Sequence, residues 1–189
     1  MKAYTSNNIR NIAVLGHGGK GKTTLCEAML YIAGASDRLG RVADGNTVLD
    51  FDSEEKRRKS SVSSAIAALE WDNTKLNIID APGLFDFEGG AAEAVRAAEA
   101  VLIVTSAGSG VDVGTEKAFR AAEKKGAAKF FAVTKTDSDH RNFYKTFDAL
   151  KEVYGNKLCP TIIPYMEGNI TKCYVNLMTG MAFSYDENG

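Results

Sequence analysis

The chain has 189 residues, of which 44% are apolar and 25% are charged, and its formal net charge is −1. This length is sufficient for one α/β domain with its own core, and the composition excludes an intrinsically disordered chain. A net charge close to zero argues against binding to nucleic acid or an anionic membrane by bulk electrostatics, so we expect no DNA partner and no membrane partner.

Cysteine and hydropathy patterns point to the cytoplasm. Cys26, Cys159 and Cys173 are odd in number and follow no metal-binding spacing, which is typical of reduced thiols. No apolar run of the sequence approaches the roughly 18 residues that cross a bilayer, and the apolar segment near the N-terminus is too short for a signal peptide. We therefore expect a cytoplasmic protein.

The first third of the chain predicts a strand, a helix and a long loop. Residues 11–16, "NIAVLG", are a short apolar run ending in glycine, which is typical of a buried strand. Residues 22–34 predict a helix that ends at Gly34. Residues 36–60 carry many charges without a clean period, and a loop of that length in a compact domain is usually functional or mobile.

The middle of the chain predicts a hairpin, a strand and a helix. Residues 61–71 and 75–80 are separated by "DNT", which favours an antiparallel hairpin. Residues 100–107, "AVLIVTSA", are a further buried strand, and the next helix is expected from Asp112 to Gly126.

The order of elements predicts the fold class. Residues 129–137, "KFFAVTKTD", are a further predicted strand, and Phe143, Phe147, Leu150 and Tyr154 follow at helical spacing. The result is an α/β fold of the P-loop NTPase type, with a mostly parallel sheet, one antiparallel strand and helices on both faces. Ligands bind such sheets at the carboxyl ends of the strands.

A glycine-rich loop joins the first strand to the first helix. Residues 16–23, "GHGGKGKT", fit the pattern G-x-x-x-x-G-K-S/T, whose backbone N–H groups and helix N-terminus bind nucleotide phosphates. Lys22 is expected to reach the β- and γ-phosphate oxygens, and the Thr23 hydroxyl to ligate Mg²⁺. The predicted nucleotide-binding residues of this loop are Gly16, His17, Gly18, Gly19, Lys20, Gly21, Lys22, Thr23 and Thr24.

Lys20 is unusual, and two interpretations of it stay open. Its side chain either points into solvent or adds a second charge near the phosphates. ATPases that position chromosomes and septa carry K-G-G-x-G-K-T, whose first lysine would fall at His17. A histidine substitutes poorly for a permanently charged lysine, so this ATPase class is disfavoured.

Residues 134–137, "TKTD", indicate which base is bound. An aspartate at this place can accept hydrogen bonds from guanine N1–H and the 2-amino group, and adenine lacks both donors. We assign Asp137 to the base and Lys135 to packing on the ring and the phosphate loop. Thr134 stands where the usual motif has asparagine, so we expect one bracing hydrogen bond in place of two and a lowered affinity.

Three further residues are expected to sense the γ-phosphate. Asp80 lies at a strand end, where its carboxylate can hold Mg²⁺ through water, and Gly83 can donate its N–H to the γ-phosphate. The loop before the hairpin should supply a second sensor, for which we choose the Ser61 hydroxyl as a Mg²⁺ ligand. Residues in these positions change conformation when the phosphate leaves. Gly83 and Lys22 are the predicted catalytic residues.

Together these segments resemble the G domain of elongation factor G, in particular its elongation factor G-like branch. The resemblance rests on "GHGGKGKTT", "NTVLDFDSEEKRRKSSVSSA", "DAPGLFDFEG", "GVDVGTEKAFR" and "TKTD", from about Ile9 onward. It implies a translational GTPase that binds GTP or GDP with Mg²⁺ and acts on the ribosome. Residues 58–62 stand where the family has R-G-I-T-I, so Ser61 takes the place of its Mg²⁺-binding threonine.

The sequence departs from the family pattern at three positions. Gly19 stands where the family usually has an aspartate associated with a monovalent cation, and Thr134 replaces the asparagine of the base motif. Leu84 replaces the histidine that orients the attacking water in D-T-P-G-H. Because positioned proton-transfer groups typically contribute about 10²- to 10⁴-fold, we expect a low intrinsic rate of GTP hydrolysis.

The resemblance also implies a domain division. Residues 1–158 are expected to form the core of the GTP-binding domain, and residues 159–189 the start of the insert that elongation factor G carries within it. The family's S-A-x motif, which contacts guanine, is absent, so we interpret the chain as a monomeric fragment. A complete small GTPase with a different ending is the alternative.

Three functions stay open. The first is the GTPase domain of a ribosome-associated translation factor, the second a GTP-gated binding module with negligible turnover, and the third a deviant P-loop ATPase. The basic run 56–59, "KRRK", is either a solvated charge cluster or, by the resemblance, a contact with ribosomal RNA.

Overall fold

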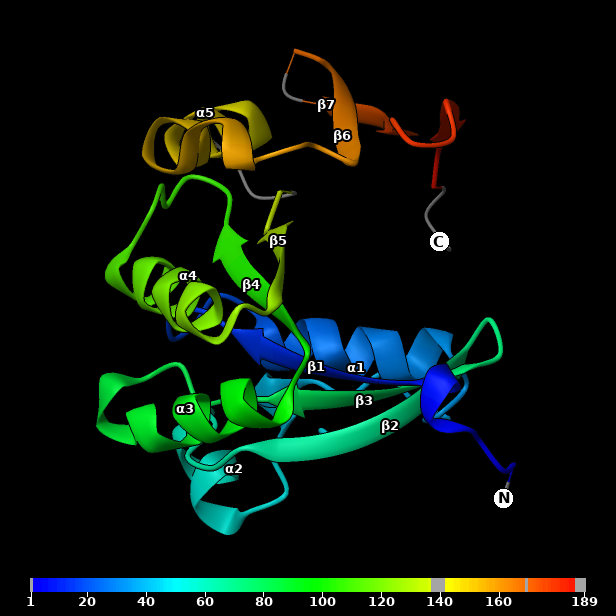
Figure 1. The fold of residues 1–189 in the computed structure, drawn as a ribbon, viewed down its shortest axis with the longest axis vertical. Coiled ribbons are helices and arrows are strands. Elements are labelled where there is room, and N and C mark those ends of the chain that lie inside the picture. The colour runs from blue at the N-terminus through cyan, green and yellow to red at the C-terminus, as the bar shows by residue number, and fades with distance from the viewer. Residues whose placement is uncertain (1, 137–141, 169, 186–189) are drawn as a thin grey trace. The chain divides into compact units, whose positions relative to one another are not determined.

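The computed structural model describes residues 2–136, 142–168 and 170–185. The chain divides into two compact units (Figure 1). The first contains the residues up to Ser106 together with Asp112–Thr134, and the second contains Ala107–Val111 with the chain from Lys135 onward.

A five-stranded sheet forms the centre of the first unit, in the order β2-β3-β1-β4-β5. Strand β2 is antiparallel to β3, and the other neighbouring pairs are parallel, which confirms the predicted sheet and hairpin. The strands are β1 (Ile9–Leu15), β2 (Ala65–Trp71), β3 (Thr74–Asp80), β4 (Ala100–Ser106) and β5 (Ala128–Thr134).

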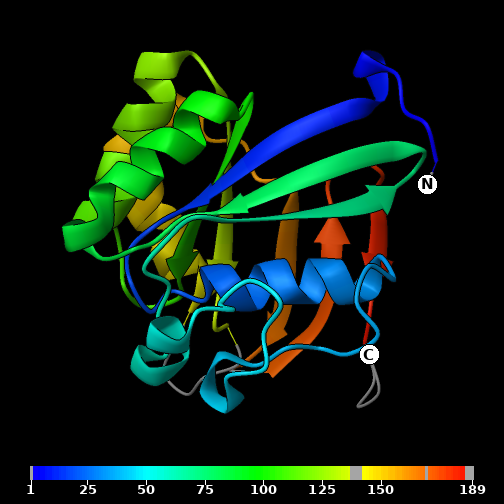
Figure 2. The ribbon, with the colours of Figure 1, turned by 90° about the horizontal axis from the view of Figure 1, so that it is seen from below.

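Helices cover both faces of this sheet (Figure 2). Helix α1 (Lys22–Ile32) packs on β2 and β3, whereas α3 (Glu88–Ala97) and α4 (Val113–Lys125) pack on β1, β4 and β5. The core beneath α1 is apolar and includes Val14, Cys26, Leu30, Leu49 and Ile78, each of which is nearly inaccessible to solvent.

Sequence signals explain where the helices begin and end. The α4 helix begins where the Asp112 carboxylate accepts the Thr115 N–H at 2.8 Å and ends at Gly126, whose φ is +73°. These bounds confirm the helix expected there. Helix α3 was not among the predicted elements.

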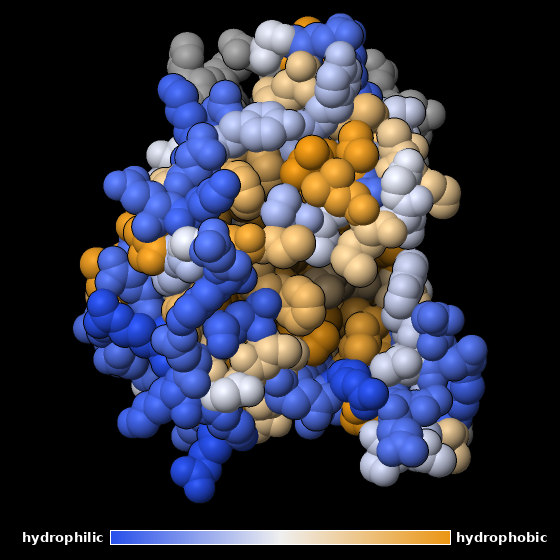
Figure 3. Space-filling model, turned by 45° about the horizontal axis from the view of Figure 1, so that its top comes forward, coloured by the Kyte–Doolittle hydropathy of each residue, from blue (hydrophilic) through white to orange (hydrophobic). Residues whose placement is uncertain are grey.

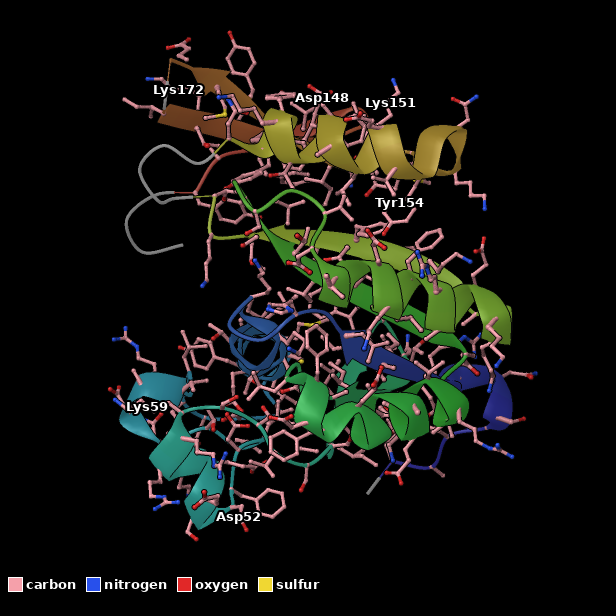
Figure 4. All side chains as sticks on the ribbon, turned by 90° about the vertical axis from the view of Figure 1, so that its left-hand side faces the viewer. Asp52, Lys59, Asp148, Lys151, Tyr154 and Lys172 are labelled. Carbon is pink, nitrogen blue, oxygen red and sulfur yellow. The ribbon has the colours of Figure 1, made fainter. Side chains whose placement is uncertain are left out.

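The expectation of a continuous loop over residues 36–60 is wrong. This segment contains a short 3₁₀ helix, η2 (Val42–Asp44), and a helix, α2 (Ser53–Arg58). A capping box formed by Asp52 and Glu55 starts α2, and Lys59, with φ of +53°, ends it. Figure 4 labels Asp52 and Lys59 beside this helix. Two further 3₁₀ turns of the first unit are η1 (Ser6–Asn8) and η3 (Phe85–Phe87).

The second unit contains one long helix and an antiparallel sheet of order β6-β7-β8. The expected last helix is confirmed as α5, which carries the labelled Asp148, Lys151 and Tyr154 of Figure 4. The Tyr144 hydroxyl donates to the Pro164 carbonyl at 2.6 Å and joins the helix to β6. The elements are α5 (Phe143–Tyr154), η4 (Gly155–Lys157), β6 (Ile162–Glu167), β7 (Ile170–Asn176) and β8 (Met181–Phe183).

Several large apolar side chains of this second sheet are exposed, including Ile162, Ile170 and Met181. Figure 3 shows hydrophobic side chains at the surface among hydrophilic ones. Within the described part of the chain, none of the helices combines the length and the apolar character that a membrane span requires.

Candidate functional site

The phosphate-binding loop lies between β1 and α1, and its glycines are required by close packing. Gly16 has φ of +140°, and a Cβ on it would collide with the Val104 carbonyl oxygen. Gly21, with φ of +86°, is the N-cap residue of α1. The backbone can therefore turn sharply from the end of β1 into the N-terminus of α1, as the sequence pattern predicts.

Lys22 and Gly83 meet on the inner side of this loop. The Lys22 ammonium donates to the His17 carbonyl oxygen at 3.2 Å. Burial lowers the pKa of Lys22, and the nearby Asp80 carboxylate acts in the opposite direction. A Cβ on Gly83 would collide with Lys22 Nζ and would lie 2.8 Å from the Gly18 nitrogen. Gly83, three residues after the end of β3, therefore packs against the backbone of the phosphate-binding loop.

Four oxygen-bearing side chains converge at the start of α1. The Thr23 hydroxyl donates to Asp80 Oδ2 at 2.6 Å and lies 3.1 Å from the Ser61 hydroxyl. The Ser61 hydroxyl in turn donates to Asp50 Oδ1 at 2.7 Å. The structure thus brings Thr23, Ser61 and Asp80 together, and it adds Asp50. We call these four residues the oxygen cluster.

The oxygen cluster is suited to a cation because two of its carboxylate oxygens are buried and unpaired. Each of the two hydroxyls donates to one carboxylate, and the remaining contact, between the Thr23 and Ser61 hydroxyls, is 3.1 Å long. Burial raises the pKa of Asp80 to about 7, and it also raises the pKa of Asp50. Asp80 Oδ1 and Asp50 Oδ2 are buried without a hydrogen-bond partner among the described residues.

This chemistry fits Mg²⁺, which prefers oxygen ligands and keeps waters or nucleotide phosphates in its shell. The described residues contain no group of three or more histidine, cysteine, aspartate or glutamate side chains that could hold a metal alone. The oxygen cluster offers two hydroxyls and two carboxylates, so phosphate and water oxygens would have to complete a magnesium shell.

Lys20 is only partly exposed, and the interpretation in which it points into solvent is wrong. Its side chain is 15% exposed and pairs with the Asp112 carboxylate at 3.2 Å. Its ammonium also donates to the Ser106 hydroxyl at 3.3 Å. Burial alone would raise the pKa of Asp112, but hydrogen bonds from Thr115 and Lys20 together lower it. The pair ties the phosphate-binding loop to the N-terminus of α4.

Thr134 braces the phosphate-binding loop from the end of β5. Its hydroxyl lies 2.7 Å from the Lys20 carbonyl oxygen and 3.1 Å from that of Thr105. A hydroxyl has one hydrogen, so it donates to one carbonyl at a time. Thr134 therefore keeps a link between β5 and the phosphate-binding loop through a single donor.

A model of the family described as the elongation factor Tu GTP binding domain matches residues 7–185. The chain belongs to this family. The GTP-binding domain is 37% identical over 162 residues to an elongation factor G-like protein of Mycobacterium tuberculosis, covering 86% of this chain and 23% of that protein. This match confirms the resemblance to the elongation factor G-like branch.

Two further comparisons agree. The domain is 34% identical over 167 residues to the mitochondrial ribosome-releasing factor 2 of Debaryomyces hansenii, covering 88% of this chain and 19% of that protein. A crystal structure from Thermus thermophilus superposes with a TM-score of 0.90 at 37% identity, covering 96% of this chain and 27% of that one. The chain spans 19–27% of the length of these proteins.

The Leu84 side chain of the GTP-binding domain packs against the phosphate-binding loop. Its side chain is 38% exposed, and a Cβ on Gly18 would lie 3.0 Å from Leu84 Cδ2. Leu84 and Phe85 also line a cavity of about 150 Å³, together with Ala91, Ala92, Ala118 and Ala121. The leucine therefore brings an apolar surface to the phosphate-binding loop, without a hydrogen-bonding group.

The remaining predicted residues are placed as follows. Gly19, with φ of +74°, has open space around the Cβ position, and Thr24 is exposed on the first turn of α1. Lys135 has the left-handed φ of +57°. Asp137 lies outside the described residues, so its assignment to the base stays a prediction.

Sequence reasoning missed Asp50 and two buried glutamates, Glu27 and Glu55. All three are at most 3% exposed. The available signal was their chemistry, because a carboxylate within an apolar neighbourhood, such as Asp50 after "TVL", needs a partner. Which partner each carboxylate finds depends on how the long loop folds back, and the local pattern does not show it.

Proposed function

We propose that this chain is the nucleotide-binding domain of a translational GTPase of the elongation factor G kind, and that it binds GTP and GDP with Mg²⁺. The observation that carries the proposal is the oxygen cluster beside the phosphate-binding loop. Its members come from α1, from β3 and from two places in the segment between α1 and β2. Their convergence fits a triphosphate bound with Mg²⁺.

Each residue has a distinct role in the proposal. Backbone N–H groups of Gly18–Lys22 bind the phosphates, and the Lys22 ammonium exchanges its bond with the His17 carbonyl for phosphate oxygens. The hydroxyls of Thr23 and Ser61 would hold Mg²⁺ directly, and Asp80 and Asp50 through water. When bound, Mg²⁺ neutralises charge that develops on the phosphates. Gly83 donates its N–H to the γ-phosphate.

The residues proposed to select the base follow β5. We assign guanine recognition to Asp137 and Lys135, with Thr134 bracing the loop. The family supports guanine over adenine, since the matching model describes a GTP-binding domain. The family therefore opposes the ATPase alternative.

The hydrolysis rate is proposed to be low. The Leu84 side chain cannot donate or accept a proton, and it occupies the place where the resemblance puts a water-orienting histidine. A positioned group of this type typically contributes about 10²- to 10⁴-fold. We therefore expect L84H to raise the rate of GTP hydrolysis by about 10- to 100-fold, and L84A to leave it within about threefold.

Single-turnover hydrolysis of GTP, with and without ribosomes, tests this expectation. The matched pair L84H and L84A separates a new histidine from the loss of the leucine. A wild-type rate that equals that of a histidine-bearing elongation factor, and that L84A abolishes, would show that Leu84 itself supports catalysis.

A GTP-gated binding module with negligible turnover is the second candidate, and Leu84 is the observation that favours it. Nucleotide-dependent affinity for a partner without measurable hydrolysis would select this function. The ribosome is the partner proposed in both cases, supported by the name of the D. hansenii relative. We also propose a cytoplasmic location, a monomeric state and a domain boundary at residue 158.

A further inference from the structure

Glu27 holds the segment immediately before Asp50. It lies on α1 and is completely buried. Its Oε1 accepts the N–H groups of Val48 at 2.8 Å and Leu49 at 3.0 Å. The two residues that precede Asp50 are therefore tied to the same helix that supplies Thr23.

Glu55 holds the segment immediately after Ser61. It lies on α2 and is 3% exposed. Its Oε1 accepts the N–H groups of Val62 at 2.9 Å and Ser63 at 3.1 Å, and its Oε2 accepts the Asp52 N–H at 3.3 Å. One carboxylate thus connects the segment before α2, close to Asp50, with the segment after α2, close to Ser61.

Packing around Glu27 restricts the loop further. A Cβ on Gly40 would collide with Glu27 Oε2 and would lie 2.9 Å from the Thr47 Cα. The loop therefore closes around this carboxylate with no room for a side chain at Gly40. Burying a carboxylate is costly unless it is hydrogen-bonded. Glu27 Oε1 and both Glu55 oxygens accept N–H groups of the backbone that carries the oxygen cluster, whereas Glu27 Oε2 is buried without a hydrogen-bond partner among the described residues.

We propose that Glu27 and Glu55 are positioning residues of the magnesium site, which fix Asp50 and Ser61 at the distances that Thr23 and Asp80 require. This inference rests on the proposed binding of Mg²⁺ with a guanine nucleotide. Neither glutamate contacts a member of the oxygen cluster through its side chain in the hydrogen bonds described above. Each acts through backbone N–H groups that are one or two residues away.

The test is the Mg²⁺ concentration that half-maximally slows dissociation of fluorescent GDP from the protein. Loss of groups that orient metal ligands typically costs about 10- to 100-fold in metal affinity. We expect E27A and E55A each to require about 10- to 100-fold more Mg²⁺. GDP affinity measured in EDTA should change less than about threefold, because the phosphate-binding loop is untouched.

Conservative and control variants separate positioning from general damage. E27Q keeps a carbonyl oxygen that can accept both N–H bonds, so it should restore most of the Mg²⁺ affinity lost in E27A. E55Q can keep the bonds from Val62 and Ser63 but loses the one from Asp52, so it should restore the affinity only in part. E54A removes the exposed neighbour of Glu55, which pairs with Arg57 and Arg58, and should behave as wild type. V101A destabilises β4, whose Val101 is fully buried, and should lower stability without changing the Mg²⁺ requirement.

Wild-type hydrogen exchange gives a readout that does not depend on the folding of any variant. The amides of Val48, Leu49, Val62 and Ser63 should exchange at least about 10-fold more slowly than unstructured amides. Unprotected exchange at these amides would overturn the proposal. A normal Mg²⁺ requirement in both alanine variants, or an equal shift in E54A or V101A, would also overturn it.

The same experiment distinguishes this inference from the proposed function. If wild-type protein retains GDP in a Mg²⁺-dependent manner and the variants match it, only the positioning role is wrong. If wild-type protein binds no GDP with or without Mg²⁺, the proposed function is wrong and the positioning role is rejected with it.

Discussion

Asp80 links the magnesium site to pH. Burial raises its pKa to about 7, whereas an aspartate in an unfolded chain titrates near 4. Between these values the metal-free native state binds more protons than the unfolded state. The stability that this carboxyl contributes is therefore present below about pH 4 and is lost as the pH rises through about 7.

We expect the free energy of unfolding of the metal-free protein to fall by roughly 3 kcal/mol between about pH 5 and about pH 8 because of this group. Asp50 acts in the same direction, since burial raises its pKa as well. Urea unfolding in EDTA measures the effect, and D80N should remove most of the slope. Since Mg²⁺ competes with the proton, Mg²⁺ affinity should increase over the same interval. An unchanged pH slope in D80N would contradict this assignment.

Thr134 is the second residue with a direct test. T134V removes the hydroxyl that reaches the Lys20 carbonyl oxygen, and a hydrogen bond of this kind contributes about 1 kcal/mol. We expect GDP affinity to fall about fivefold in T134V, to stay near wild type in T134S, and to equal or exceed wild type in T134N. Isothermal titration calorimetry gives the three values. Equal affinity in T134V and wild type would show that the brace is unimportant.

Among the elements, the phosphate-binding loop and α4 make a close backbone contact that a substitution can test. A Cβ on Gly114 would lie 2.6 Å from the His17 Cα, and Lys20 pairs with Asp112 at the same end of α4. The two elements therefore pack backbone to backbone. A methyl group between them has no flexible side chain to displace.

We expect G114A to lower the free energy of unfolding by about 1–3 kcal/mol, as overpacking does, and to weaken nucleotide binding with it. The matched control is G89A, because Gly89 lies in α3 with no atom near the Cβ position. G89A should be neutral or slightly stabilising, since alanine favours a helix over glycine. Chemical unfolding and calorimetry measure both. Similar losses in the two variants would show that the contact is not specific.

For the whole molecule, the sequence predicted those elements whose signals lie within a few neighbouring residues. The strands of the first sheet, helices α1 and α4 and the phosphate-binding loop follow from apolar runs, caps and one motif within a few residues. Helix α2 was missed because a six-residue helix depends on its capping box more than on a hydrophobic period. Asp50 was missed because its role arises from a hydrogen bond to Ser61, eleven residues away.

The Lys20 side chain is a further feature that the local sequence did not predict. Its loop was predicted correctly, but the sequence left open whether its side chain points into solvent or toward the phosphates, and the structure pairs it with Asp112, far away in the sequence. No local pattern relates two residues at that separation. The proposed role of Asp137 in binding the base follows from the motif and the family.

Guanine selectivity is the claim that most directly decides what this protein does. Calorimetric titration of the protein with GTP and with ATP, each with Mg²⁺, measures it. A site whose carboxylate is paired by guanine and left unpaired by adenine discriminates strongly, so GTP should bind at least about 100-fold more tightly than ATP. Equal affinities, or tighter binding of ATP, would contradict the assignment of Asp137 and the function built on it.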